Sequence, residues 1–452
     1  MSTLNFKVNA QQLSAEITNI LDEESINDIA KETGFTCRTS EKITGFKFLD
    51  ILLFTHFNHK ELSLNDLSIQ LLKRFGVKIR KQSIDERFTE GAVRFFKTVL
   101  EKAIGISINQ DSKIDFTNFE TVRIKDSTSF QLPENMKDKY PGSGGSASPA
   151  AIRIQFEYDL KNEKILDLNL YPFTTQDMTN ARDTIHDINT NDLVIRDLGY
   201  IKVEFLQEIV NKEAYYLNRL HSNSTVYQLI NSKYKEIDFE GLHKYMKKNK
   251  LTRVEKEVYL GVEKFQTRII IECLPDAIYQ KRLRQAKKSA AKNKKQISKA
   301  RKAKMGLNIF ITNTEIPAEQ IRLLYTIRWQ IELMFKIWKS IGEIDKVKKM
   351  KVERFETYLF AKLIWIAINW HIMRQIVIHF FNESGIEISP YKLFKTLKIS
   401  LMDFRSALKT GFESVVSFIN EIVEMSPGNH TSEKKKGIIT WSYDVMRLFK
   451  TA

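Results

Sequence analysis

The sequence predicts an α/β protein in which a mixed β-sheet lies between two helical regions at the ends of the chain. Apolar residues recur every three to four positions before residue 110 and after residue 315, which is typical of amphipathic helices. Between these regions apolar and polar residues alternate, which indicates strands. The chain has 452 residues, too many for a single core, so we expect several domains.

The composition indicates a polyanionic partner. The formal net charge is +16 and the isoelectric point is about 9.4, and nucleic acid is the usual partner of such a protein. A chain rich in lysine only because its genome is rich in A and T is the alternative. The two cysteines, Cys37 and Cys273, provide neither a disulfide framework nor a zinc cluster, which suits a reducing cytoplasm.

We expect no membrane partner. The N-terminal residues lack the apolar core of a signal peptide. The longest apolar run starts at Leu359–Trp370 and includes Lys362, His371 and Arg374, so it is predicted to be a buried core helix.

Residues 1–110 are predicted to form a helical DNA-binding domain. The better of two helix–turn–helix patterns is Ser63–Phe88, where Ser63 can cap a first helix and Gly76 can end it. Lys78, Arg80 and Lys81 would then open the second helix and contact DNA. A helical hairpin without a DNA role is the alternative. The periodic segments are Leu13–Leu21, Ile26–Thr33, Phe46–Phe57, Asn65–Phe75 and Ile84–Ile104.

Residues 111–220 are predicted to form the first part of a catalytic core. The expected order is strand Glu120–Leu132, strand Ile152–Leu160, strand Lys164–Tyr171, helix Met178–Ile188, strand Asp192–Leu198, helix Val203–Val210 and strand Ala214–Leu220. Three antiparallel strands followed by alternating helices and strands are the order of a ribonuclease-H-like core. The first strand carries Asp126 and the fourth carries Asp197, so we expect these acids to lie side by side.

Residues 221–314 are predicted to form a β-rich insertion with a basic block, Lys281–Lys304. The strand-like pieces are Arg253–Leu260, Lys264–Leu274 and Leu307–Thr312. The block has 12 Lys or Arg in 24 residues and no acid, so it should be helical and contact the DNA backbone. A solvated charge run is the alternative. The predicted contacts are Lys281, Arg282, Arg284, Lys287, Lys288, Lys294 and Lys295.

The second part of the core, residues 315–385, is predicted to contain the helix Leu324–Ser340. Its polar residues, Tyr325, Arg328, Glu332 and Lys339, fall within roughly 60° around the helix axis. Glu332 is the expected third acid, and an amphipathic helix with only a local Arg328–Glu332 pair is the alternative. The long helix Phe355–Phe381 should seal the core, and residues 386–452 are expected to be helical, with dimerisation as a candidate role.

These residues resemble a DDE transposase of a bacterial insertion sequence, in the group with a YREK signature. The spacing Tyr-x2-Arg-x3-Glu-x6-Lys is met by Tyr325, Arg328, Glu332 and Lys339. The resemblance covers roughly residues 115–374. Its other carriers are Val122–Thr128, Tyr140–Gly145, Val194–Tyr200 and Tyr215–Leu220.

The resemblance implies metal-dependent DNA cleavage and strand transfer at the terminal inverted repeats of an insertion sequence. Asp126, Asp197 and Glu332 would bind two Mg²⁺ ions, with Mn²⁺ as a possible substitute, and Tyr325, Arg328 and Lys339 would grip DNA near the scissile phosphate. It further implies target DNA as a substrate, a homodimer on DNA and a cytoplasmic, nucleoid-associated location. A ribonuclease-H-fold nuclease without strand transfer and an inactive DNA-binding derivative are the alternatives.

Relatives that cut DNA through a hairpin stack a flipped base on a Trp in the insertion. All five Trp residues of this chain lie outside the insertion, so Tyr259, Phe265 and Phe310 are the aromatic candidates there.

Overall fold

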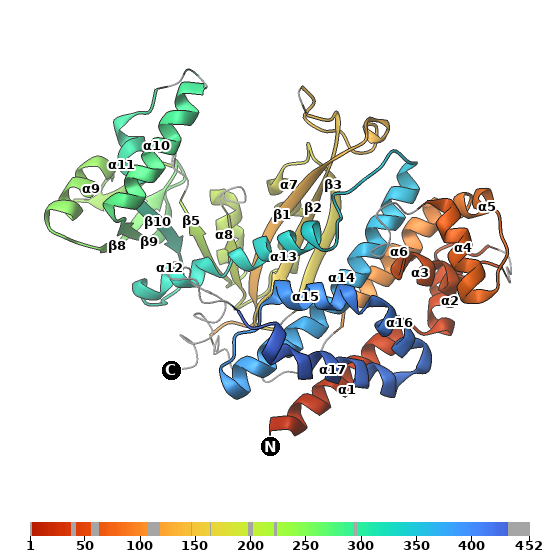
Figure 1. The fold of residues 1–452 in the computed structure, drawn as a ribbon. Coiled ribbons are helices and arrows are strands. Elements are labelled where there is room, and N and C mark those ends of the chain that lie inside the picture. The colour runs from red at the N-terminus through yellow and green to blue at the C-terminus, as the bar shows by residue number, and fades with distance from the viewer. Residues whose placement is uncertain are drawn as a thin grey trace.

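The computed structural model describes residues 2–37, 42–55, 63–106, 118–145, 147–162, 164–197, 202–220, 224–292, 294 and 296–432. Lys295 and residues 433–452, on which two of the predictions fall, lie outside the described residues. Figure 1 shows a central sheet, with the helices from both ends of the chain gathered on one side and the insertion on the other.

The helices before the first strand begin and end largely where the sequence predicts. The side chain of Ser63 accepts the Asp66 backbone N–H while the Asp66 carboxylate accepts the Ser63 N–H, and Gly76 ends the same helix at φ 67°. The bounds are α1 (Ser2–Ile20), α2 (Glu23–Glu32), α3 (Gly45–Leu53), α4 (Leu64–Phe75), α5 (Lys81–Asp85) and α6 (Glu90–Ile104).

One of these predictions was wrong. The segment Ile84–Ile104 is not one helix, because the side chain of Thr89 caps α6 separately by accepting the Ala92 N–H at 3.3 Å. The second helix of the expected helix–turn–helix, α5, therefore has only five residues. Lys78 and Arg80 lie in the segment before it and not inside the helix.

The strands of the described residues form one mixed, ten-stranded sheet in the order β3-β2-β1-β4-β5-β10-β9-β8-β6-β7. β1, β2 and β3 are antiparallel, whereas β4 runs parallel to both β1 and β5. This is the predicted core order. The bounds are β1 (Val122–Leu132), β2 (Ala150–Asp159), β3 (Lys164–Pro172), β4 (Leu193–Arg196) and β5 (Tyr215–Arg219).

The insertion continues the same sheet, because β10 pairs with β5 in antiparallel orientation. The strands β8, β9 and β10 match the predicted pieces, and the basic block is largely helical, as expected. The sequence analysis missed β6, β7 and α9. The bounds are β6 (Val226–Ile230), β7 (Lys233–Glu236), α9 (Phe239–Lys248), β8 (Arg253–Leu260), β9 (Phe265–Cys273), α10 (Asp276–Lys292), α11 (Lys299–Met305) and β10 (Leu307–Thr312).

The sheet carries helices on both faces. Against one face pack α12 (Ala318–Thr326), α13 (Trp329–Ser340) and α14 (Val352–Ser384); the ring of Trp338, for example, lies 4.9 Å from that of Phe156 on β2. The other face meets α7 (Asp177–Asp183), the short η2 (Ile185–Asp187) and α8 (Val203–Asn211). The predicted helix Met178–Ile188 is thus two short pieces.

The helices at the two ends of the chain share one hydrophobic core with α12–α14. The ring of Phe88 lies 5.2 Å from that of Tyr358 on α14, and Phe54 lies 6.3 Å from Phe404. The last described helices are α15 (Pro390–Ile399), α16 (Leu401–Thr410) and α17 (Phe412–Asn429). The division into five domains predicted from the sequence stays a prediction.

α14 is the core helix that the sequence predicts. It has 33 residues and is long and apolar enough to span a membrane, but 89% of its most apolar window is buried inside the protein. The polar residues in its central part, between Glu356 and Gln375, are buried with it, including Lys362, which donates to the Glu343 carbonyl at 2.6 Å.

Candidate active site

Two parallel strands bring the first two acids together. β1 and β4 pair in parallel with Lys125 opposite Arg196, and Asp126 and Asp197 are the residues that directly follow this pair. Asp126 faces α13, because its carboxylate accepts a hydrogen bond from Arg328. The predicted adjacency of the strands that carry Asp126 and Asp197 is therefore confirmed by the sheet register.

The predicted helix Leu324–Ser340 tightens at its most polar point, where Ile327 (φ −54°, ψ −34°) and Arg328 (φ −51°, ψ −30°) keep right-handed helical dihedrals. Ile327 and Arg328 form a tight turn between α12 and α13, where the N–H groups of Ile327, Arg328, Gln330 and Ile331 each bond to the carbonyl three residues earlier. No Gly or Pro marks this turn. We attribute it to the burial of Arg328, whose side chain is drawn toward β1.

Arg328 joins two of the acids. Its Nη1 donates to Asp126 Oδ2 at 2.6 Å, and its Nη2 donates to Glu332 Oε1 at 3.0 Å. The side chain of Glu332 is 54% exposed, whereas that of Arg328 is only 7% exposed. The guanidinium therefore lies at the base of the site, with Glu332 at its solvent side.

Tyr325 joins the remaining acid, Asp197, to the same group. Its hydroxyl donates to Asp197 Oδ1 at 3.2 Å, and the Arg328 guanidinium carbon lies 5.9 Å from the centre of its ring. The ring itself is fixed by Phe310 on β10, with 5.4 Å between the centroids. The three predicted acids thus gather around one arginine and one tyrosine at the junction of α12 and α13.

The electrostatics reflect this crowding. Burial raises the pKa of Asp126 to about 6, with Asp197 and Glu332 adding to the rise and Arg328 and the Ser127 N–H opposing it. Burial also raises the pKa of the Tyr325 hydroxyl, and Asp197 raises it further. For Arg328, burial lowers the pKa, but the surrounding acids and Tyr325 more than compensate and hold it above its usual value.

Lys339 lies apart from this group. Its ammonium donates to the Ser129 carbonyl on β1 at 3.0 Å, and burial lowers its pKa. It therefore connects α13 to β1, two turns beyond Glu332.

The donor set suits a divalent metal ion in its chemistry, since carboxylate oxygens are the ligands that Mg²⁺ prefers. In this structure, the Arg328 guanidinium lies between the carboxylates of Asp126 and Glu332. Within the described residues, no three His, Cys, Asp or Glu side chains lie close enough to hold a metal ion together.

The comparisons with known proteins show the family of this chain. Residues 117–370 match the family model described as "Transposase DDE domain". The chain belongs to the DDE transposases of bacterial insertion sequences. It is 31% identical to the transposase for insertion sequence element IS231D of Bacillus thuringiensis subsp. finitimus, over 96% of this chain and 95% of the relative. Against the transposase for insertion sequence element IS1151 of Clostridium perfringens the identity is 28%, over 97% and 96% of the two chains.

The basic block of this transposase has an inner and an outer side. Arg282 donates to the Leu307 carbonyl at 3.3 Å and to Asn308 Oδ1 at 2.9 Å, so it attaches α10 to β10. Lys304 likewise donates to the Ser224 carbonyl and lies over the Phe239 ring. The outer, exposed residues include these predicted contacts: Lys281, Arg284, Lys287, Lys288 and Lys294.

The predicted N-terminal contacts lie on the surface. Lys78, Arg80 and Lys81 are all exposed, in and just before α5. The same surface exposes Lys73 and half of Leu72 on α4. These residues are available to DNA, although a five-residue helix is short for a recognition helix.

One exposed residue of the site escaped the sequence analysis. Trp329 follows Arg328 and is 51% exposed. Trp329 lies outside the face of this helix that carries the buried apolar residues, and this position was the signal in the sequence for its exposure. Of the candidates for stacking in the insertion, Phe265 and Phe310 are buried and only Tyr259 is partly exposed.

Proposed function

We propose that this transposase binds the terminal inverted repeats of its insertion sequence and catalyses metal-dependent cleavage and strand transfer with Asp126, Asp197 and Glu332. The observation that carries the proposal is the gathering of these acids around Arg328 and Tyr325, from β1, the end of β4 and α13. An amphipathic helix with only a local ion pair would not need Arg328 to reach Asp126, 202 positions away in the sequence.

Asp126, Asp197 and Glu332 would hold two Mg²⁺ ions, for which Mn²⁺ can substitute. Such ions, when bound, activate the attacking oxygen and stabilise the leaving oxygen of a phosphodiester. The residues fit this role because their carboxylates are hard oxygen donors, and because Arg328 and Tyr325 bring them together where β1, the end of β4 and the start of α13 meet.

The chain's own residues then prepare the site for DNA. Tyr325 orients the carboxylate of Asp197 through its hydroxyl, and Arg328 offsets the charge of the acids until DNA and metal arrive. A guanidinium presents several donors in a fixed fork, so Arg328 can transfer its hydrogen bonds from carboxylates to a phosphate. Trp329 offers an exposed indole beside it, which suits contact with a base.

The remaining DNA contacts would supply affinity. The exposed residues of α10 form a basic surface at the insertion end of the molecule, and Lys78, Arg80 and Lys81 form a second one on the N-terminal helices. Contacts of this kind neutralise phosphates and position the duplex without reading its sequence. Two copies of the chain, one for each end of the element, would assemble on DNA and carry the ends to a target.

The experiment that tests the proposal is a strand-transfer assay. Purified protein is incubated with Mg²⁺, a labelled duplex that carries the terminal repeat, and a plasmid target. We expect cleavage at the end of the repeat and joined products with the plasmid. Cleavage without joining would instead indicate a nuclease, and binding without cleavage would indicate an inactive derivative.

A further inference from the structure

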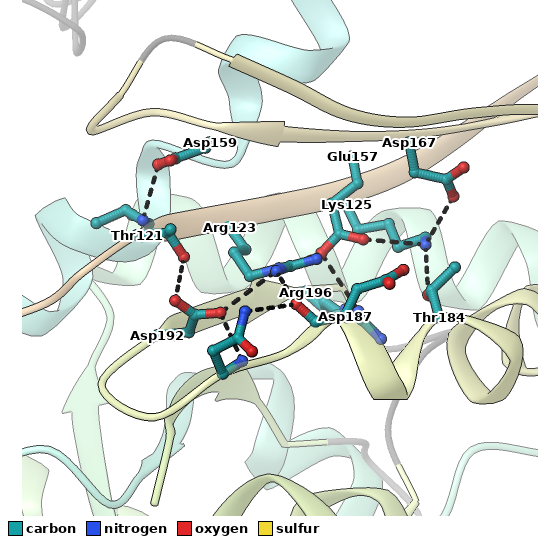
Figure 2. Close-up of polar contacts among 12 residues, drawn as sticks. Thr121, Arg123, Lys125, Glu157, Asp159, Asp167, Thr184, Asp187, Asp192 and Arg196 are labelled. Atoms are coloured by element: carbon teal, nitrogen blue, oxygen red, sulfur yellow. Dashed lines mark hydrogen bonds and ion pairs between the residues drawn. The ribbon is translucent and has the colours of Figure 1, made fainter. Parts of the chain in front are cut away.

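The face of the sheet that is turned away from the acids contains a buried cluster of charges. It comprises three cations, Arg123, Lys125 and Arg196, and three acids, Glu157, Asp167 and Asp192. None of the six is more than 9% exposed. Figure 2 shows them between β1, β2, β3 and β4 and the helical segment at Thr184.

Glu157 on β2 lies at the centre of this cluster. Its Oε2 accepts from Lys125 Nζ at 3.1 Å, and its Oε1 accepts from Arg123 Nε at 3.0 Å. The same Oε1 lies 3.5 Å from Arg196 Nη2. One carboxylate therefore contacts cations on both β1 and β4, the two strands that position Asp126 and Asp197.

The cluster has a direct structural relation to the active site. Lys125 immediately precedes Asp126, Arg196 immediately precedes Asp197, and the two cations are opposite each other in the parallel pairing of β1 and β4. Because side chains alternate along a strand, the cation before each acid points to the opposite face. Without Glu157, the positive charges of Lys125 and Arg196 would face each other directly before Asp126 and Asp197, where the pairing of β1 and β4 sets the distance between these acids.

The residue after Asp126 is fixed in the same way. The Ser127 hydroxyl donates to Asp177 Oδ1 at 2.9 Å, and Asp177 also accepts from Arg153 and Gln155 on β2. Lys125 in turn reaches Asp167 on β3 and Thr184 after α7, at 3.1 and 2.8 Å. The backbone on both sides of Asp126 is thus held from the rear of the sheet.

We propose that Glu157 is a positioning residue for Asp126 and Asp197, which it holds at their spacing by clamping Lys125 and Arg196 behind them. Buried ion pairs are often no more stabilising than apolar residues of the same volume, so stability alone is a weak reason for six buried charges. A cluster that fixes the relative position of two strands gives these charges a role. The inference rests on the proposed function, since it concerns the residues that would hold the metal.

The test measures metal binding and not activity. Mn²⁺ binding is read from the electron paramagnetic resonance signal of the free ion, with the protein on a non-cleavable duplex of its terminal repeat. Glu157→Gln removes the central charge and should weaken Mn²⁺ binding about tenfold. This is the lower end of the loss in metal affinity found when a residue that supports metal ligands, without binding the metal, is replaced. Glu157→Asp is the second variant, for the case in which Glu157→Gln does not fold. It keeps the charge but moves the carboxylate away from Lys125 and Arg196, so it should also weaken Mn²⁺ binding.

The matched control is Asp50→Asn. Asp50 is also buried, 5% exposed, and accepts from Arg74 at 2.9 Å and Arg405 at 2.7 Å, but in the helical body away from the acids. This variant should lose thermal stability and bind Mn²⁺ within about twofold of the wild type. Wild-type Mn²⁺ affinity in a folded Glu157 variant, or an equal loss in Asp50→Asn, would overturn the inference. The proposed function itself is tested by Asp126→Asn, which should abolish the Mn²⁺ site of the wild-type protein. If the wild type binds no Mn²⁺, or if Asp126→Asn binds it equally well, the proposed function is overturned.

Discussion

Arg328 has two acidic partners, and a lysine could not satisfy both. Its two terminal nitrogens reach Asp126 at 2.6 Å and Glu332 at 3.0 Å, whereas an ammonium is a single point charge on a flexible chain. We therefore expect Arg328→Lys to reduce single-turnover cleavage by about a hundredfold, the cost of a misplaced group in a site of this kind. Arg74→Lys, which replaces the guanidinium that binds Asp50 by an ammonium, is the control and should leave cleavage near the wild-type rate. Full cleavage by Arg328→Lys would show that the fork is dispensable.

At the residue scale, the sequence predicts which side chains lie together better than it predicts their burial and their contacts. The spacing of Tyr325, Arg328 and Glu332 correctly predicted one polar group, and the structure also contains the local Arg328–Glu332 pair of the alternative interpretation. The burial of Arg328 was not predictable, because its second partner, Asp126, is 202 positions away. Charges such as Lys125 and Glu157 look like the solvent-facing positions of alternating strands, and only the helical segments packed against them bury them.

At the element scale, α10 separates contact residues from structural ones. We expect replacement of the exposed residues Lys281, Arg284, Lys287, Lys288, Lys292 and Lys294 by Gln to weaken binding equally for cognate and random duplexes. The slope of log K against log salt is negative, and each phosphate that the protein no longer neutralises reduces its magnitude by roughly 0.9, so the magnitude should fall by about 5 if all six residues touch DNA. The inward-facing Arg282→Gln should leave the slope unchanged. A slope whose magnitude does not fall in the sixfold variant would show that α10 is not a DNA-binding element.

The helix α14 makes a pH-dependent contribution to stability through His371. Burial lowers the pKa of this histidine to about 4, whereas an unfolded histidine titrates near 6.5. The unfolded chain therefore takes up a proton first as the pH falls, and stability should be lost between about pH 6.5 and pH 4 by about 3 kcal/mol. His371→Gln removes this titration, so urea denaturation at pH 7.5 and 4.5 should show a smaller loss in the variant. An equal loss in both proteins would contradict the assignment.

Element boundaries show where the sequence was insufficient. The strands β8 and β10 match their predicted limits, because an alternating pattern between turn residues defines them locally. The tight turn between α12 and α13 has no local signal, and we attribute it to the contact of Arg328 with Asp126. The exposed edge strand β7 was missed because its four residues, Lys233–Glu236, carry no apolar alternation.

At the scale of the whole molecule, the N-terminal helices share their core with the rest of the chain. Phe88 packs on Tyr358, Phe54 on Phe404, and the buried Asp50 pairs with Arg405. We expect a fragment of residues 2–106 to lack a cooperative thermal transition, because these partners would be missing and its apolar faces exposed. Circular dichroism during heating is the measurement. A sharp transition in the fragment would show that these helices fold as an independent domain.

The order of the core strands, β3-β2-β1-β4-β5, was predictable because three strands followed by alternating helices and strands are the element order of a ribonuclease-H-like core. The continuation of the sheet through the insertion was not, since the pairing of β10 with β5 joins segments about 90 positions apart. This continuity connects the basic helix α10, through the α10–β10 contacts of Arg282, to the strands beside the acids.

The central claim is that α13 supplies the third acid of the catalytic site, and one substitution tests it most directly. Glu332→Gln keeps the size of the side chain and a similar helix propensity, so the fold should survive, but it removes a negative charge beside Arg328. A gel assay with Mg²⁺ and a duplex carrying the terminal repeat should show binding at least as tight as the wild type and no cleavage. If Glu332 were only the partner of Arg328 on an exposed helix face, the change would cost a few tenths of a kcal/mol in stability, roughly the worth of such a pair. Full cleavage by Glu332→Gln would contradict the account.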